Sequence, residues 1–438
     1  MAGIAQVFTA RHGVVDGGWV DAPWLCVDSG GMVVRVGAGD PPEDFGIIRD
    51  LGPVVLLPGF VNAHSHAFQR AIRGATHHRG ADDPSSFWSW REAMYSTANT
   101  LTPDEVYRVS RQAFAEMLEA GITCVGEFHY LHHRPGGGRY DDPNELGRQV
   151  VAAATDVGIR IVLLDVFYAR GGHQRPALPE QQRFCDHDVD AYLSRVDALR
   201  ADGIDVGITP HSVRAVPAAS LRALAAYANR EQLPIHTHLS EQPRENEECL
   251  AEHGTTPARV FADAGCCERP HAFTAVHAVH VTAEDRSTLA DQHVAACPTT
   301  EADLGDGIVG AAELLAGGTT LALGSDSNAV IDLIQEARLL EMHERLSTQS
   351  RLRLVDAQGR LWPTLLDAAT RGGASALGKS QTLGTLAPGR PFDACTIALD
   401  HPSTEGIVPH CVLDAVFASG TAAPVRHVFV GGRARGGG

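Results

Sequence analysis

The chain has 438 residues, of which 44% are hydrophobic and 20% charged, a composition typical of a globular protein with a sizeable core. Its formal net charge of −17 argues against nucleic acid and anionic membranes as partners, because both favour basic surfaces. The nine cysteines form no CxxC pair, and no N-terminal stretch has the apolar length of a signal peptide or a membrane span. We therefore expect a cytoplasmic protein with reduced thiols.

The two ends of the chain have the same local pattern. Residues 1–55 alternate short apolar pieces with glycine, aspartate and proline, and residues 383–433 do the same. This pattern is typical of short antiparallel strands. We predict that residues 1–55 and 383–438 pair into one small β-sandwich domain.

Between these flanks, eight short β-like runs follow one another, and most are separated by helical or loop stretches. The runs are Val54 to Val61, Ile122 to Phe128, Ile159 to Val166, Val206 to Thr209, Pro234 to Leu239, Phe273 to Val279, His293 to Cys297 and Thr319 to Leu323. Eight such units in about 270 residues match the size of a closed barrel. We predict an α/β fold, with a (β/α)8 barrel over residues 56–382 as the catalytic domain.

Chemically active side chains follow these runs at their carboxyl ends, where the active site of such a barrel lies. They are His64 and His66 after the first run, Glu127, His129 and Tyr130 after the second, His211 and Arg214 after the fourth, His238 and Glu241 after the fifth, His277 after the sixth and Asp326 after the eighth. The predicted fold therefore brings them to one barrel mouth.

Two His-x-His pairs indicate a metal site. They are His64 with His66, and His236 with His238. Residues i and i+2 of a strand project to the same face, so each pair can reach one point above the barrel. Neutral imidazole is a common zinc ligand, and a catalytic zinc site keeps one position open for water. One pair alone is weak support, but two pairs with Asp326 at the same end of the barrel predict a metal.

Several stretches resemble the amidohydrolase superfamily over nearly the whole chain: "PGFVNAHSH", "HTHLSEQ", "AVHAVH" and "LGSDS". Within it, the chain is most similar to the formimidoylglutamate deiminases, through "HSHAFQRAIRG", "SFWSWREAMY", "GEFHYLHH", "PHSVRAV", "HLSEQPRENEEC" and "GSDSNAVIDLIQEARLLE". These enzymes of histidine degradation hydrolyse N-formimidoyl-L-glutamate to N-formyl-L-glutamate and ammonia. The resemblance also implies a homodimer.

The resemblance implies one divalent metal, zinc, held by His64, His66, His238 and Asp326. It implies that Glu241 shuttles a proton from water to the leaving nitrogen, and that His277 and Asp326 orient the nucleophile and stabilise the tetrahedral adduct. His236 is then expected to pack beneath the metal. Lys379, the only lysine in the chain, lies beyond the last run. A carbamylated lysine bridging two metals is therefore not expected.

The substrate of such an enzyme carries two carboxylates, and the planar guanidinium of arginine binds a carboxylate through two hydrogen bonds. The resemblance points to five substrate-binding residues. They are Gln69, Arg91, Tyr130, His211 and Arg214. One position departs from the family, because Asp303 stands where we expect asparagine. An extra carboxylate near an anion site is expected to weaken substrate binding or to alter substrate preference.

Two other functions fit the metal motif. The first is deamination of a ring amidine, such as a guanine, cytosine or adenosine derivative, which needs an apolar or aromatic slot rather than arginines. The second is a catalytically inactive scaffold on the same barrel, which the intact metal and proton-transfer residues disfavour.

A further motif, "GASALGKS" at 373–380, matches a phosphate-binding P-loop, but it follows a helical stretch where a P-loop follows a strand. We interpret that match as chance.

Overall fold

The computed structural model describes residues 4–41, 47–78, 87–186, 188–419 and 424–435. Its centre is an eight-stranded parallel sheet in which every strand pairs with the next along the chain. The strands are β8 (Phe60–Ser65), β9 (Ile122–His129), β10 (Arg160–Phe167), β11 (Val206–Pro210), β12 (Ile235–Leu239), β13 (Phe273–His277), β14 (His293–Ala296) and β15 (Thr320–Leu323). A parallel bridge between Ser65 and Asp326 brings the first and last strands together. The predicted barrel is confirmed.

The barrel strands match the predicted runs because strands that are covered on both faces are continuously apolar. The first run is the exception. Residues 54–61 form two strands in two different sheets, divided at Gly59: β7 (Val54–Pro58) pairs with the flanking strands, and β8 begins the barrel. A Cβ atom on Gly59 would lie 2.3 Å from the Thr123 hydroxyl, so only glycine allows this close passage between the sheets.

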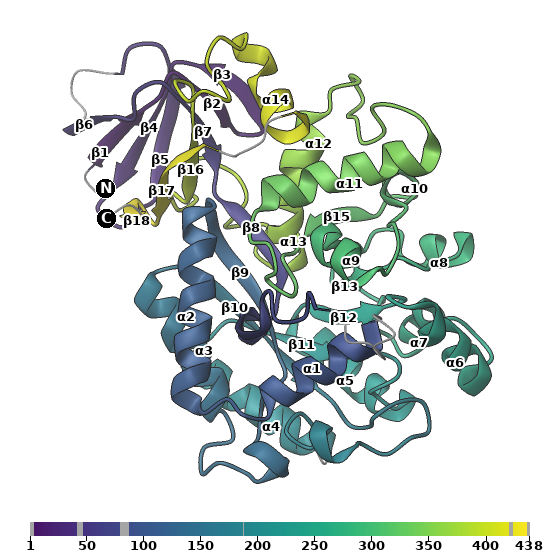
Figure 1. Ribbon diagram of the computed structural model, residues 1–438. Helices are drawn as coiled ribbons and strands as arrows, with labels where there is room; N and C mark the ends of the chain where they lie inside the picture. The colour runs from purple at the N-terminus through teal and green to yellow at the C-terminus, as the bar shows by residue number, and fades with distance from the viewer. Residues whose placement is uncertain (1–3, 42–46, 79–86, 187, 420–423, 436–438) are drawn as a thin grey trace.

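Helices surround the barrel and connect its strands (Figure 1). They are α1 (Phe87–Ala98), α2 (Pro103–Glu119), α3 (Glu145–Val157), α4 (Val189–Ala201), α5 (Ala218–Glu231), α6 (Pro243–His253), α7 (Pro257–Asp263), α8 (Ala283–Thr288), α9 (Pro298–Leu304), α10 (Ala311–Ala316), α11 (Leu333–Thr348), α12 (Trp362–Asp367) and α13 (Gly373–Ala376). Helix α2 begins with the capping box of Thr102 and Glu105, and α3 ends at Gly158 in the left-handed conformation. Within the described residues, no helix is both long and apolar enough to cross a membrane.

Two further sheets contain strands from the chain flanks, which lie together in Figure 1 as purple and yellow ribbons. One has the order β5-β4-β1-β6 and the other β18-β17-β16-β7-β2-β3. The strands are β1 (Ile4–Thr9), β2 (His12–Val15), β3 (Gly18–Asp21), β4 (Pro23–Asp28), β5 (Val33–Ala38), β6 (Ile47–Asp50), β16 (Ala394–Ala398), β17 (Val425–Val430) and β18 (Arg433–Arg435). Phe8 and Phe392, from opposite ends of the chain, stack at 4.3 Å in the core between the sheets.

The flanks differ from the prediction in two details. Two strand pairs, β1 with β6 and β2 with β7, are parallel, although we expected antiparallel pairing throughout. The C-terminal flank also contains a helix, α14 (Val412–Ala418), which contacts α11 and α12. Its buried residues Val412, Leu413, Val416 and Phe417 follow helical spacing, and this periodicity distinguishes the segment from a strand.

Candidate active site

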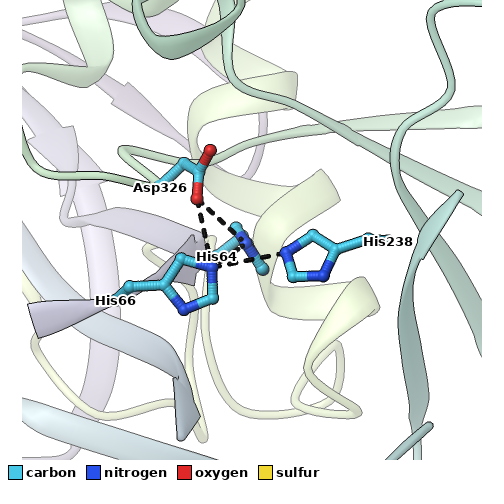
Figure 2. A group of neighbouring side chains, drawn as sticks. All are labelled: His64, His66, His238 and Asp326. Atoms are coloured by element: carbon cyan, nitrogen blue, oxygen red, sulfur yellow. Dashed lines mark hydrogen bonds and ion pairs between the residues drawn. The ribbon is translucent and has the colours of Figure 1, made fainter. Parts of the chain in front are cut away.

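Three imidazoles and one carboxylate converge at the carboxyl-terminal end of the barrel (Figure 2). His66 Nε2 lies 3.2 Å from His64 Nε2 and 3.3 Å from His238 Nε2. Asp326 Oδ1 lies 3.3 Å from His64 Nε2 and 3.2 Å from His66 Nε2. All four candidate ligand atoms lie within 4.8 Å of one another, so the structure brings together the four residues predicted to hold the metal.

The protonation state of these imidazoles favours the binding of a metal cation. His66 Nδ1 lies 2.9 Å from the Phe128 carbonyl and His238 Nδ1 lies 3.2 Å from the His211 carbonyl, so each Nδ1 carries the proton and donates it. Burial lowers the pKa of His64 to about 3 and holds the pKa of His238 well below its usual range. With Nδ1 as the donor, the Nε2 atoms of His66 and His238 face each other, and Nε2 of His66 also faces His64 Nε2 and the Asp326 carboxylate. A divalent cation satisfies this set of acceptors.

The backbone that carries Asp326 is joined directly to the strand that carries the first two histidines. The His66 N–H donates to the Asp326 carbonyl at 2.8 Å, and the Asp326 N–H donates to the His64 carbonyl at 3.0 Å. Asp326 has a φ of 43°, a left-handed conformation that is unusual for a residue other than glycine. These two hydrogen bonds hold that conformation and direct the carboxylate toward the imidazoles.

Two buried titratable groups adjoin the four candidate ligands. His277 Nε2 lies 3.7 Å from Asp326 Oδ2 and 3.7 Å from Glu241 Oε1. On its other side, His277 Nδ1 lies 3.4 Å from Glu301 Oε1. Burial alone lowers the pKa of His277, but Glu241 and the other two carboxylates outweigh it and raise the pKa to about 10. The arrangement places the Glu241 carboxylate and the His277 imidazole beside the candidate metal site.

A cavity of about 600 Å³, including its open mouth, lies above these groups and reaches His66, His238, Glu241 and Asp326. All five residues predicted to bind substrate line it: Gln69, Arg91, Tyr130, His211 and Arg214. Arg214 is only 8% exposed, and its Nη2 lies 3.5 Å from Glu241 Oε2. Arg91 stacks on Trp88, with Cζ 4.5 Å from the ring centroid. The cavity therefore combines two guanidinium groups with the carboxylate of Glu241.

Gln69 supplies a free acceptor to this cavity. Its Nε2 donates to the Tyr130 hydroxyl at 2.8 Å, while its Oε1 is buried and has no hydrogen-bond partner among the described residues. The Tyr130 hydroxyl in turn contacts Met94 Sδ at 3.6 Å. An unpaired buried carbonyl oxygen is costly unless a ligand donates to it. A substrate N–H group is a suitable donor.

His236 and Lys379 lie away from the four candidate metal ligands. His236 Nε2 lies 2.7 Å from the Ala376 carbonyl, and His236 is not among the four converging side chains. Lys379 Nζ lies 2.6 Å from Asp205 Oδ1, just before the start of β11 and so at the opposite end of the barrel. The Lys379 N–H donates to the Ala374 carbonyl, which makes "GASALGKS" the end of a helix. It is not a P-loop.

Glu127 and Asp303, two other positions named from the sequence, contact neighbouring residues rather than the candidate metal ligands. Glu127 Oε1 accepts from the Ala67 N–H at 2.6 Å and so supports the turn that follows His66. Asp303 Oδ1 lies 2.7 Å from His77 Nε2 and is not among the residues that line the cavity. Asp303, the position at which the sequence comparison led us to expect asparagine, therefore contacts His77 on the segment that precedes α1.

The sequence analysis missed residues after the third and seventh strands. Tyr168 directly follows β10 and lines the cavity, and Glu301 lies in α9 after β14, where it contacts His277. The rule that active residues follow barrel strands would have found both. Glu245 is a third such residue: its Oε1 accepts from the Ser240 N–H at 2.9 Å, and its Oε2 lies 3.7 Å from Arg214 Nε. It lies within the quoted stretch "HLSEQPRENEEC".

Comparison with known proteins shows similarity along nearly the whole chain. Residues 55–435 match the model of the amidohydrolase family. A formimidoylglutamate deiminase of Pseudomonas aeruginosa is 36% identical over 97% of this chain and 93% of its own length. An 8-oxoguanine deaminase of the same species is 30% identical over 90% of this chain and 84% of its own. A solved amidohydrolase of Brucella melitensis has a TM-score of 0.88 and 33% identity, covering 98% of this chain and 94% of that one.

Proposed function

The chain belongs to the amidohydrolase family and is a hydrolase of C–N bonds, and we propose that its substrate is N-formimidoyl-L-glutamate. Water would convert the formimidoyl group to a formyl group and release ammonia, a step of histidine degradation. The observation that carries this proposal is the cavity itself, in which Arg91 and Arg214 lie with Glu241 and the candidate metal ligands. In a chain of net charge −17, two guanidinium groups at one site favour an anionic substrate.

Glu241 and His277 would handle the protons of this reaction. A divalent metal, which we propose to be zinc, would acidify water when bound by the three histidines and Asp326, and so supply hydroxide near neutral pH. Glu241 accepts the proton that this water loses and delivers it to the nitrogen that leaves as ammonia. His277 is charged and lies 3.7 Å from both Glu241 and Asp326. It stabilises the negative charge that develops on the atoms bonded to the formimidoyl carbon during the attack.

Arg214 and Gln69 would recognise opposite ends of the substrate. The Arg214 guanidinium is buried at the cavity wall, where a carboxylate of the substrate gains a charge-assisted hydrogen bond with little competition from water. His211 lines the same wall. Gln69 Oε1, which has no partner among the described residues, accepts from a formimidoyl N–H. Binding at both ends orients the formimidoyl carbon toward the metal group.

A ring amidine is the second candidate substrate, because the cavity is also rich in aromatic side chains. Phe87, Trp90, Tyr95, Tyr130 and Tyr168 line it. Such rings stack on a purine, and 8-oxoguanine deaminase is the name of one relative at 30% identity. A neutral ring, however, offers no carboxylate to Arg91 or Arg214, so neither guanidinium of the cavity would bind an anionic group of the substrate.

Ammonia release separates the two candidates. The metal-loaded protein is incubated with N-formimidoyl-L-glutamate and, in parallel, with guanine, cytosine and S-adenosylhomocysteine. We expect ammonia from the first alone, and a rise of about 10- to 100-fold in KM for Arg214→Gln. Arg222→Gln, an exposed arginine on α5, serves as the matched control and should behave as the parent protein. Turnover of a ring compound without turnover of N-formimidoyl-L-glutamate would overturn the proposal.

A further inference from the structure

A second group of two histidines and a glutamate joins the loop after β10 to the end of α6. His173 lies in that loop, and Glu252 and His253 are the last two residues of the helix. One ligand atom from each residue lies within 4.8 Å of the other two. Glu252 Oε2 lies 2.5 Å from His173 Nδ1 and 3.7 Å from His253 Nε2. One carboxylate oxygen therefore faces both imidazoles.

Both imidazoles have a buried nitrogen without a hydrogen bond. His173 is only 8% exposed, and its Nε2 has no hydrogen-bond partner among the described residues. The Nε2 atom of His253 faces Glu252, and it is likewise buried without a hydrogen bond to any part of the chain that the structure describes. Buried polar atoms without partners are uncommon in folded proteins, and a bound ion is one explanation for them.

Arg170 fixes the orientation of the Glu252 carboxylate. Its Nη1 donates to Oε1 at 2.8 Å, and its Nη2 donates to Oε2 at 3.0 Å. The same guanidinium donates to the carbonyls of Arg214 and Val213, at 3.0 and 3.1 Å, and these bonds hold it in place. Carboxylates that bind metals are commonly oriented by such a hydrogen-bonding partner. Because a carboxylate has about four lone-pair directions, Oε2 can bind an ion while it accepts from Arg170.

The end of α6 favours a cation, and Arg170 limits how strongly the cation binds. The helix ends at Gly254, directly after His253. The carbonyl groups at a helix end give it a partial negative charge, which attracts cations beside the last turn. The guanidinium of Arg170 repels a cation and offsets the charge of Glu252. We therefore expect weaker binding here than at the four candidate ligands of the barrel mouth, so that dialysis removes the ion.

The ligand atoms favour zinc over magnesium and calcium. Zinc binds imidazole nitrogen and carboxylate oxygen in sites with few protein ligands. Magnesium and calcium prefer a full set of oxygen ligands, which two imidazoles and one carboxylate do not supply.

We propose that His173, Glu252 and His253 form a second zinc site, in which His173 Nδ1, Glu252 Oε2 and His253 Nε2 bind the ion. Water completes the coordination. His173 exchanges its contact with Glu252 for a bond to the ion, and its ring changes tautomer so that Nε2 carries the proton. This site is separate from the metal group at the barrel mouth, and it does not depend on which substrate the protein hydrolyses.

The ion would connect two segments that adjoin the cavity. Tyr168 lines the cavity and precedes His173 in the same loop. Helix α6 follows Glu241 and contains Glu245, which contacts Arg214. Zinc bound between the loop and the helix holds them together in the folded chain. A ligand that binds only the folded protein also stabilises it against unfolding.

Zinc titration tests the site without any substrate. Protein that has kept its first metal through dialysis is titrated with zinc against a chromophoric chelator. We expect the parent protein to bind a further zinc ion per chain, and His173→Gln and His253→Gln to bind that ion at least about 10-fold more weakly while they keep the first. His410→Gln alters an exposed histidine of η5 (Pro409–Cys411) and should behave as the parent protein. Absence of a further zinc in the parent protein, or equal uptake by all the variants, would overturn the proposal.

His238→Ala separates the two sites. It removes a candidate ligand at the barrel mouth, so zinc that this variant binds in titration belongs to the second site. We expect this zinc to be lost when His253→Gln is added, and we expect zinc to raise the Tm of His238→Ala but not that of the double variant. Equal rises in both proteins, or an equal rise with magnesium or calcium, would show that the cluster is not a zinc site.

Discussion

Asn62 on β8 and Ser325 directly after β15 exchange two hydrogen bonds across the closure of the barrel. Asn62 Nδ2 donates to Ser325 Oγ at 2.7 Å, and the Ser325 N–H donates to Asn62 Oδ1 at 3.1 Å. Ser325 Oγ donates on to Asn328 Oδ1 at 2.7 Å, and Asn328 Nδ2 donates to Ser65 Oγ at 3.0 Å. All four residues are fully buried. This chain of hydrogen bonds joins the two segments that carry His64, His66 and Asp326.

The first prediction concerns this connection. Asn62→Leu leaves the Ser325 N–H without its acceptor and Ser325 Oγ without the donor from Asn62, and it loosens the position of Asp326 relative to the two histidines. We expect metal affinity to fall about 10-fold or more, and the free energy of unfolding to fall by about 1–3 kcal/mol. Chelator competition and chemical denaturation measure the two effects. Asn229→Leu, which alters a contact to Gly265 on the outer layer, should leave metal affinity unchanged. Unaltered metal affinity in Asn62→Leu would contradict the positioning role.

Two histidines on one strand should behave differently. His238→Ala removes a candidate ligand, and we expect the purified variant to lack both metal and activity. His236→Ala removes only the partner of the Ala376 carbonyl and some buried volume, so metal should remain bound while stability falls by about 1–3 kcal/mol. Elemental analysis of both proteins after dialysis makes the comparison. Loss of metal from His236→Ala would show that it takes part in ligation.

Glu241→Gln tests the proton shuttle. The amide retains the size of the side chain but accepts no proton, so we expect kcat to fall by about 10²- to 10⁴-fold at unchanged metal content. Steady-state ammonia release measures kcat. Glu247→Gln, on the exposed side of α6, is the matched control and should retain full activity. A Glu241→Gln protein with near-parental kcat would exclude this residue as the shuttle.

Arg183 anchors the helix that carries Arg91 and Tyr95. Its guanidinium is fully buried and donates to the carbonyls of Leu101 at 2.6 Å, of His133 at 3.0 Å and of Ala98 at the end of α1. Arg183→Met leaves these carbonyls unpaired. We expect the free energy of unfolding to fall by about 3–5 kcal/mol, measured in urea.

The exposed Arg222→Met is the control for Arg183→Met and should shift the unfolding midpoint little. If Arg183→Met unfolds at nearly the same urea concentration as the parent protein, solvent or neighbouring groups replace its hydrogen bonds. The anchoring role of Arg183 would then be wrong.

Asp303→Asn tests the departure from the family pattern. Asp303 contacts His77 and does not line the cavity, so its charge is directed away from the substrate. We expect KM to change by less than about fivefold, because a partly exposed pair contributes at most about 1 kcal/mol. Steady-state kinetics at low and physiological salt measure the effect. A larger fall in KM would support the sequence-based expectation that this carboxylate weakens substrate binding.

The barrel strands were predictable because their information is local. Strands covered on both faces are continuously apolar, and the eight runs end within about two residues of the observed strands wherever a single sheet is involved. The run at 54–61 was misinterpreted because both of its halves are buried strands. The two halves are separated by the pairing of β7 with β2 and with β16. In the second pair, Cys395 lies 337 residues from its contact Pro58.

Strand spacing and order predict a metal site at the barrel mouth, and the family resemblance implies which four residues hold the metal. Alternation along a strand sends His64 and His66 to the same face, and parallel strands put their carboxyl ends at one mouth, so spacing and order predict the convergence. The tertiary structure alone revealed the contacts of Arg183 and the Asn62–Ser325 connection. Each makes its contacts with segments distant in sequence, whose positions depend on how the loops pack. Short-range spacing contains no information about such contacts, because a loop's course is set by the partners it meets in the folded chain.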